Sequence, residues 1–233
     1  MKNIRFKLAI ICITLSVLFL SSCTTGGIGY EFRYSNATWE RGRTYITGIE
    51  NKMISDSSCS RSLSLYNAIP VPVVKIPERH KGDTVIGVNI RGANIDTLKI
   101  PKTIERIDGR DYAEIRKFEV DEDNEFYKSI EGVLFSKDGK ELCCYPHGRP
   151  YDTYVIPDGV EIVNCSISDL DSLELPSSLV SVQGSFSDIE RLVYKGTMTE
   201  WNFVVENSPS LNFYNVEKVV CLDEELMLSQ KNN

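Results

Sequence analysis

The amino-acid sequence predicts a mainly β fold, a solenoid in which short parallel strands stack into a ladder. Two observations lead to this prediction. Short phrases have apolar residues at alternate positions, the period of a strand with one buried face, and the phrases recur at a nearly constant interval. They are VVKIP at 73–77, TLKIP at 97–101, KFEVD at 117–121, TYVIP at 153–157, SLELP at 172–176 and RLVYK at 191–195.

The interval between the phrases is nearly constant along the chain. Tyr154, Leu173 and Leu192 are evenly spaced, Leu98 and Phe118 are only slightly further apart, and Val74 precedes Leu98 by a longer step. Further apolar residues repeat at fixed offsets. Val160, Val163, Ile167 and Leu170 of one unit recur as Leu179, Val182, Phe186 and Ile189 of the next. Because one turn cannot bury its own apolar row, the units must stack. Between strands, around 163–167, we expect turns or short irregular segments.

Residues 1–22 have the composition of a secretory signal peptide. Three basic residues, Lys2, Arg5 and Lys7, precede an apolar run at 8–20, and two serines follow it. This run is too short for a membrane-spanning helix, which needs roughly 20 residues. We therefore exclude this segment from the predicted fold.

Cys23 directly follows the two serines. The phrase LSSC at 20–23 resembles the bacterial lipobox, in which the cysteine thiol receives a diacylglycerol. We therefore predict lipidation of Cys23 and attachment to the cell envelope, at the outer membrane, facing either the surface or the periplasm. Each buried methylene contributes roughly 0.8 kcal/mol, so several acyl chains make the attachment permanent. An ordinary signal peptide with a chance cysteine is the alternative.

The exported part is acidic and has an odd number of cysteines beyond Cys23. The formal charge is −7 for the whole chain, and loss of the three basic signal residues makes it more negative. Nucleic acid is therefore a poor candidate partner. The cysteines beyond Cys23 imply no complete disulfide framework. They are Cys59, Cys143, Cys144, Cys165 and Cys221.

The exported part divides into several segments. Asp138 and Gly139 form a favoured hairpin turn between expected strands at 133–136 and 141–145, and Trp39–Ile49 is expected to form strands of a cap. The predicted segments are a flexible tether at 23–36, an N-terminal cap at 37–72, the solenoid at 73–222 with a hairpin insertion at 124–146 and a closing module at 194–222, and a polar tail at 223–233 that is frayed or a short helix.

The repeat phrases, the hairpin phrase at 124–146 and YKGTMTEW at 194–201 occur in a specific order. In this order they resemble the BspA-like leucine-rich repeats of bacterial surface proteins over roughly residues 70–222. The resemblance implies a leucine-rich-repeat solenoid and adhesion to host or bacterial proteins. Two features depart from the family pattern: the units are short, and Gly92 replaces an aromatic residue in one of them.

No residue pattern indicates an active site, a metal site or a cofactor. Cys143, Cys144 and His147 could pair a thiolate with a base, but alternation along ELCCYP predicts that Leu142 and Cys144 share one buried face of the hairpin. The acidic residues at 121–125 lack the ligand spacing of a calcium loop and are typical of a solvated turn. Trp201 and Tyr194 are predicted to cap the last rung and not to form a sugar platform.

Binding to a protein is therefore the predicted function, with no enzyme activity. Residues beside the buried pair of each strand should point outward and form the binding face. They are Thr97, Lys99, Lys117, Glu119, Thr153, Val155, Ser172, Glu174, Arg191 and Val193. Two alternatives stay open. One is a structural or assembly component of the cell envelope, and the other is an enzyme that uses Cys144 and His147.

Overall fold

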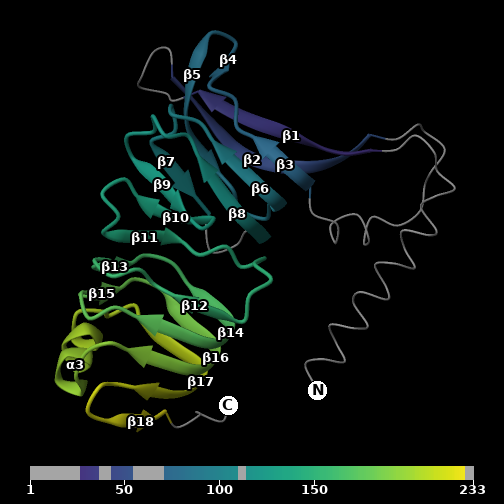
Figure 1. Ribbon diagram of the computed structural model, residues 1–233. Helices are drawn as coiled ribbons and strands as arrows, with labels where there is room; N and C mark the ends of the chain where they lie inside the picture. The colour runs from purple at the N-terminus through teal and green to yellow at the C-terminus, as the bar shows by residue number, and fades with distance from the viewer. Residues whose placement is uncertain (1–26, 37–42, 55–70, 110–113, 229–233) are drawn as a thin grey trace, which may run out of the picture.

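The chain is a β-solenoid of about six turns, so the predicted mainly β fold with parallel ladders is confirmed. The computed structural model describes residues 27–36, 43–54, 71–109 and 114–228. The turns stack along the chain, from β1 at one end to β18 at the other (Figure 1). The predicted signal peptide, Cys23 and Cys59 lie outside the described residues.

One side of the solenoid consists of two parallel sheets, which we call the front sheets. The first contains, in order, β3 (Val71–Lys75), β6 (Asn94–Ile100) and β8 (Glu114–Val120). The second contains β12 (Thr153–Val155), β14 (Ile167–Leu175), β16 (Ser185–Tyr194), β17 (Asn212–Val220) and an antiparallel edge strand, β18 (Glu225–Met227). The pairs expected from the repeat interval are present, for Tyr154 faces Leu173, and Leu173 faces Leu192.

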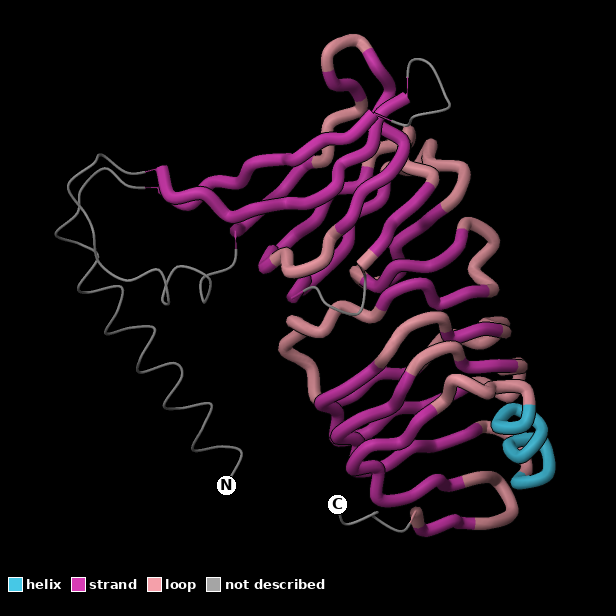
Figure 2. Tube along the Cα trace, turned by 180° about the vertical axis from the view of Figure 1, so that it is seen from behind, coloured by secondary structure: helices cyan, strands magenta, loops and turns pink. Residues whose placement is uncertain are grey.

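Further strands lie on the opposite side, in two back sheets (Figure 2). The first contains β1 (Gly27–Asn36), β2 (Arg43–Ile54), β5 (Asp83–Asn89) and β4 (Arg79–His80), with β7 (Arg106–Asp108) beside β5. The second contains β15 (Ser181–Val182), β13 (Ile162–Val163), β11 (Glu141–Cys144), β10 (Val133–Ser136) and β9 (Tyr127–Ile130).

The path between front and back strands is more regular than the sequence predicted. The two-residue strands β13 and β15 pair in parallel, and Ile167 already begins the long strand β14. Asp169 and Asp188 have φ values of 62° and 52°, a left-handed conformation that short polar side chains tolerate. In β14 and β16 the chain therefore turns its corner within the strand, and the pairing resumes beyond it.

The interior contains two apolar cores. The first gathers buried side chains from Ile46 to Cys144, and the second gathers those from Val133 to Cys221. The positions predicted to point inward, such as Leu98 and Leu173, are fully buried. The hairpin of β10 and β11 contributes to both cores, and it therefore joins the two halves of the solenoid.

The predicted hairpin is present, but the alternation predicted along its second strand is wrong. Leu134 faces Cys144 while Phe135 faces Leu142, so β11 carries one extra residue at this point. Such a bulge shifts the later side chains to the opposite face. As a result Leu142 packs in the second core, whereas Cys143 and Cys144 pack in the first.

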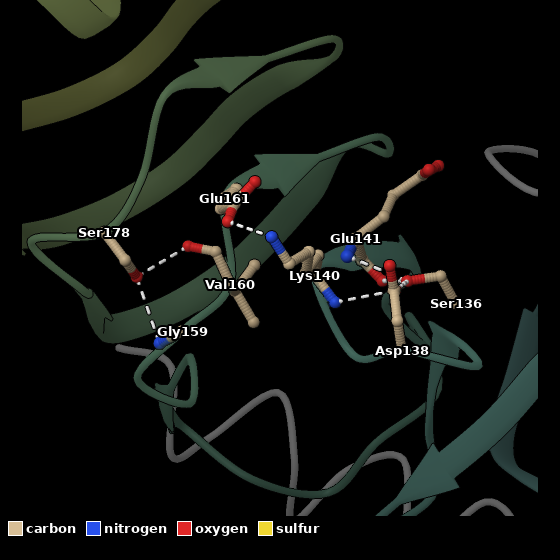
Figure 3. A network of polar contacts seen from close by, with 8 residues as sticks. All are labelled: Ser136, Asp138, Lys140, Glu141, Gly159, Val160, Glu161 and Ser178. Atoms are coloured by element: carbon tan, nitrogen blue, oxygen red, sulfur yellow. Dashed lines mark hydrogen bonds and ion pairs between the residues drawn. The ribbon is translucent and has the colours of Figure 1, made fainter.

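Polar contacts fix the hairpin turn against the next turns of the solenoid (Figure 3). Ser136 Oγ donates to Asp138 at 2.6 Å and accepts from the backbone N–H of Glu141 at 2.9 Å. Lys140 reaches Glu161 on the following turn at 2.7 Å. The hydroxyl of Ser178, one turn further on, donates to the Val160 carbonyl at 2.8 Å. The hairpin turn is thereby held in register with the following turns of the solenoid.

The predicted flexible tether at 23–36 is wrong for residues 27–36. These residues form β1, which pairs with β2 in antiparallel register from Gly27 with Ile54 to Asn36 with Thr44. Phe32 and Tyr34 are half-buried while their neighbours are exposed, and this alternation stabilises a strand despite the nearby glycines. The N-terminal cap therefore begins at Gly27, and β2 is its second strand.

The C-terminal end has a helix, α3 (Met198–Glu206), inserted between β16 and β17. Thr197 begins it with a capping box to Glu200, and Trp201 is 2% exposed beside Tyr194, with 5.5 Å between ring centres. This arrangement agrees with a structural cap. The predicted frayed or helical tail is wrong for Glu225–Met227, which form the strand β18. The chain turns back just before this strand, where the Cys221 N–H donates to the Glu224 carbonyl at 2.8 Å.

Candidate binding surface

The outward residues of the front strands form two rows across the sheets. In the second front sheet the rows are Thr153, Ser172, Arg191 and Lys218, and Val155, Glu174, Val193 and Val220. In the first front sheet they are Val73, Thr97 and Lys117, and Lys75, Lys99 and Glu119. We call these rows the front face. Neighbouring strands lie about 4.8 Å apart, so one partner can contact several members of a row.

Nine of the ten predicted face residues reach solvent, and Thr97 does not. Val155 is 51% exposed, whereas Thr97 is only 7% exposed. Thr97 lies between Val73 and Lys117 in the same row, and these longer side chains flank its short one. The prediction of Thr97 as a contact residue is therefore wrong, and its place on the front face is structural.

The structure adds four residues to the predicted face. They are Val73 and Lys75 on β3, and Lys218 and Val220 on β17. The number of residues between paired positions is larger from β16 to β17 than from β14 to β16. Leu173 faces Leu192, whereas Leu192 faces Val219. The inserted helix α3 causes this longer step, so a search at the constant repeat interval misses the strand. The buried apolar residues Val219 and Cys221, two apart as in the other phrases, are the signal that could have found it.

Ion pairs hold the charged members of the front face in place. Glu119 lies 2.6 Å from Lys117 Nζ and 3.0 Å from Lys99 Nζ, and the hydrogen bonds from these lysines lower the pKa of its carboxyl group. On the second sheet Lys195 lies 3.1 Å from Glu174, and this hydrogen bond raises the lysine pKa. Glu119 therefore stays ionised at neutral pH, which suits a fixed surface charge and not proton transfer.

A row of acidic residues borders the second front sheet at the corner of the solenoid. Its members are Asp152, Asp171, Glu190 and Glu217, all exposed and one to a turn. The first front sheet instead presents Lys75, Lys99 and Lys117. The second front sheet itself carries Arg191 and Lys218 beside Glu174, so its acidic side chains gather at this border.

The residues of the predicted thiol alternative have different surroundings. Cys143 and Cys144 are buried in the first core. His147 is half-buried beside Tyr145, with ring centres 6.4 Å apart, and its Nδ1 lies 3.4 Å from Ser168 Oγ. Tyr145 and Ser168 thus contact the His147 ring. Among the described residues, no group of three or more His, Cys, Asp or Glu side chains could hold a metal ion.

Comparison with known proteins gives two distant structural neighbours. A leucine-rich repeat protein from Eubacterium ventriosum shares 13% identity and a TM-score of 0.37, with 71% of this chain and 73% of that chain covered. The pneumococcal vaccine antigen PcpA shares 12% identity and a TM-score of 0.21, with 83% of this chain and 99% of that chain covered. No protein-family model matches the sequence, and no curated protein matches it.

Helices contribute little to the described part of the chain. None of its helices has the length and apolar character needed to cross a membrane.

Proposed function

We propose that this chain is a bacterial envelope lipoprotein, anchored through Cys23, whose front face binds a protein partner. The alignment of outward side chains into continuous rows on rigid parallel strands supports binding. Val155, Val193 and Val220 lie in one row among charged and hydroxyl side chains. A protein interface needs apolar residues that lose water on contact and polar residues that set the register. The face offers both.

The sequence supports the anchor. LSSC at 20–23 has the order of residues that lipidation requires, and β1 begins at Gly27, shortly after Cys23. The order of the repeat, hairpin and closing phrases resembles BspA-like surface proteins, which supports adhesion to host or bacterial proteins. The proposed place is the outer membrane. The alternative, an assembly component facing the periplasm, would use the same surface, so exposure at the cell surface decides between them.

Lipidation is tested by replacing Cys23 with alanine and labelling growing cells with a radioactive fatty acid. We expect the native chain to incorporate label and the variant to accumulate as an unlabelled precursor. Persistent label in the variant would remove the anchor assignment.

Binding by the front face is tested with Val155→Glu and Val193→Glu together. On intact cells, we expect external protease to cleave the native chain. In a capture experiment, we expect the native chain to bind host matrix proteins and the double variant to bind none. The matched control is Val180→Glu, which changes a valine with 44% exposure outside the front sheets. Protection from protease on intact cells would support the periplasmic alternative. Equal capture by the double variant and the control would contradict binding through this face.

A further inference from the structure

Arg149 lies in the loop that joins the hairpin to β12, where the first front sheet ends and the second begins. Its backbone N–H donates to the Pro146 carbonyl at 3.1 Å, and the neighbouring Gly148 N–H donates to Ile115 of β8 at 3.0 Å. Thr153 and Val155 of the front face follow only a few residues later. The loop is therefore held against both front sheets, beside the face that we propose for binding.

Three tyrosine rings surround the guanidinium of Arg149. Its central carbon lies 4.9 Å from the ring centre of Tyr151, 5.2 Å from that of Tyr154 and 5.8 Å from that of Tyr145. All three distances are within the range of cation–π attraction. Tyr145 and Tyr154 are buried, whereas Tyr151 is 57% exposed. We call Arg149 and these three rings the Arg149 cage. Tyr151 is the ring of the cage that can move without exposing a core.

The cage leaves two polar atoms unsatisfied. Nη1 of Arg149 and the hydroxyl of Tyr145 are both buried and have no hydrogen-bond partner within the part of the chain that the structure describes. Aromatic faces attract the positive charge but accept no conventional hydrogen bond from the guanidinium N–H groups. A buried donor without an acceptor costs free energy, and more so when it is charged.

No carboxylate of the described residues forms an ion pair with Arg149, although the lysines and other arginines nearby on the front sheets have acidic partners. Burial raises the pKa of the Tyr145 hydroxyl, so this group remains protonated and able to donate at neutral pH. Among the described residues, the cage therefore presents two donors and a positive charge without an oxygen anion that would accept from them.

We propose that the Arg149 cage binds a carboxylate carried by an aspartate or glutamate side chain of the partner protein. The inference rests on the proposed function and names the chemistry of one contact within it. A carboxylate forms short charge-assisted hydrogen bonds with a guanidinium. Tyrosine and arginine are also the residue types that dominate binding energy at interfaces. The exposed Tyr151 ring moves aside and then covers the bound group.

The test uses the purified chain in detergent, with 3-fluorotyrosine in place of tyrosine and fluorine NMR as the measurement. Tyr145, Tyr151 and Tyr154 are assigned by single replacement with phenylalanine. The probe is N-acetyl-glutamate amide, and its neutral counterpart, N-acetyl-glutamine amide, is the ligand control at equal ionic strength. We expect the glutamate probe to shift the Tyr151 and Tyr154 signals in a saturable way and the glutamine probe to leave them unchanged.

Variants separate the cage from the general charge of the surface. Arg149→Gln should abolish the response, and Arg149→Lys, which keeps the charge and loses the planar fork, should weaken it about tenfold. Arg191→Gln is the matched control, because it removes an exposed arginine of the same face outside the cage, and it should leave the response intact. If Arg149→Gln fails to fold, Tyr151→Ala changes only the exposed ring and should weaken the response.

Equal shifts with the two probes, or a full response in Arg149→Gln, would overturn the inference. Its failure is distinguishable from failure of the proposed function. If Val155→Glu with Val193→Glu abolishes partner capture and Arg149→Gln does not, the face binds a protein but the cage takes no carboxylate.

Discussion

Leu173 of β14 and Leu192 of β16 face each other in parallel register, and both are fully buried. They are equivalent residues of two successive units, so the repeat interval in the sequence is the length of one turn of the solenoid. The next pair along the same strands, Glu174 and Val193, points to the front face. One step along the chain therefore separates the core from the proposed binding surface.

This relationship predicts a sharp contrast between neighbouring substitutions. Leu173→Ala should reduce the free energy of unfolding by about 2 to 5 kcal/mol, because it leaves a cavity in the second core. Glu174→Ala should cost less than about 1 kcal/mol, since it removes only a partly exposed ion pair with Lys195. Urea unfolding measured by circular dichroism gives both values. Equal costs at the two positions would show that the phase of the strand is wrong.

Asn124 is fully buried, although the sequence places it in an acidic turn that was expected to be solvated throughout. Its amide group donates to the Pro101 and Ile104 carbonyls, both at 2.9 Å, and its oxygen accepts from the Phe126 and Tyr127 N–H groups. Asn124 thus links the hairpin insertion to the preceding turn of the solenoid.

We therefore predict that Asn124→Ala destabilises the chain by roughly 3 kcal/mol or more, because it leaves several buried backbone groups unsatisfied. Asn124→Asp should also be costly, since it keeps the acceptor and loses both donors. The neighbouring Asp123→Asn, on an exposed side chain, is the control and should be nearly silent. Thermal unfolding of the three variants compares them directly, and a silent Asn124→Ala would contradict the linking role.

Gly87 of β5 leaves room for the Tyr45 ring of the N-terminal cap. A Cβ atom at this position would overlap the ring of Tyr45 on β2, closer than any packed contact allows. Gly87→Ala should therefore push the half-buried Tyr45 ring aside and lower the melting temperature by a few degrees. Tyr45→Ser should restore much of the loss in the double variant, because it removes the ring that clashes. A double variant no more stable than Gly87→Ala would place the strain elsewhere.

The sequence predicted the fold wherever the apolar pattern repeats at a fixed interval. Leu98, Leu173 and Leu192 illustrate this, because stacking makes their environments equivalent. The prediction failed where one local event changed the phase, as at the bulge beside Cys143. It also failed where a strand depends on its partner and not on its own composition. Gly27–Asn36 pairs with β2, which supplies its hydrogen bonds, whereas its glycines and small residues alone suggest a tether.

The candidate site was predicted only in part, because it depends on contacts between residues that the strand pattern does not describe. Alternation along a strand identifies outward residues such as Val155, but it does not measure how neighbours in a row cover one another, as they cover Thr97. The Arg149 cage joins residues of the hairpin, a loop and β12. No spacing rule relates Tyr145, Arg149 and Tyr154, because their proximity arises from the loop that returns the chain to the front sheets.

The last prediction concerns the buried thiols of the hairpin. Cys143 and Cys144 are buried in the first core, and His147 contacts Tyr145 and Ser168. The combined replacement of Cys143 by Ser, Cys144 by Ser and His147 by Gln should therefore lower stability by about 1 to 3 kcal/mol and leave partner capture intact at temperatures well below unfolding. Cys143→Ala with Cys144→Ala, which places no hydroxyl in the core, should be less costly and serves as the control. Loss of capture at an unchanged melting temperature would instead assign these side chains a chemical role.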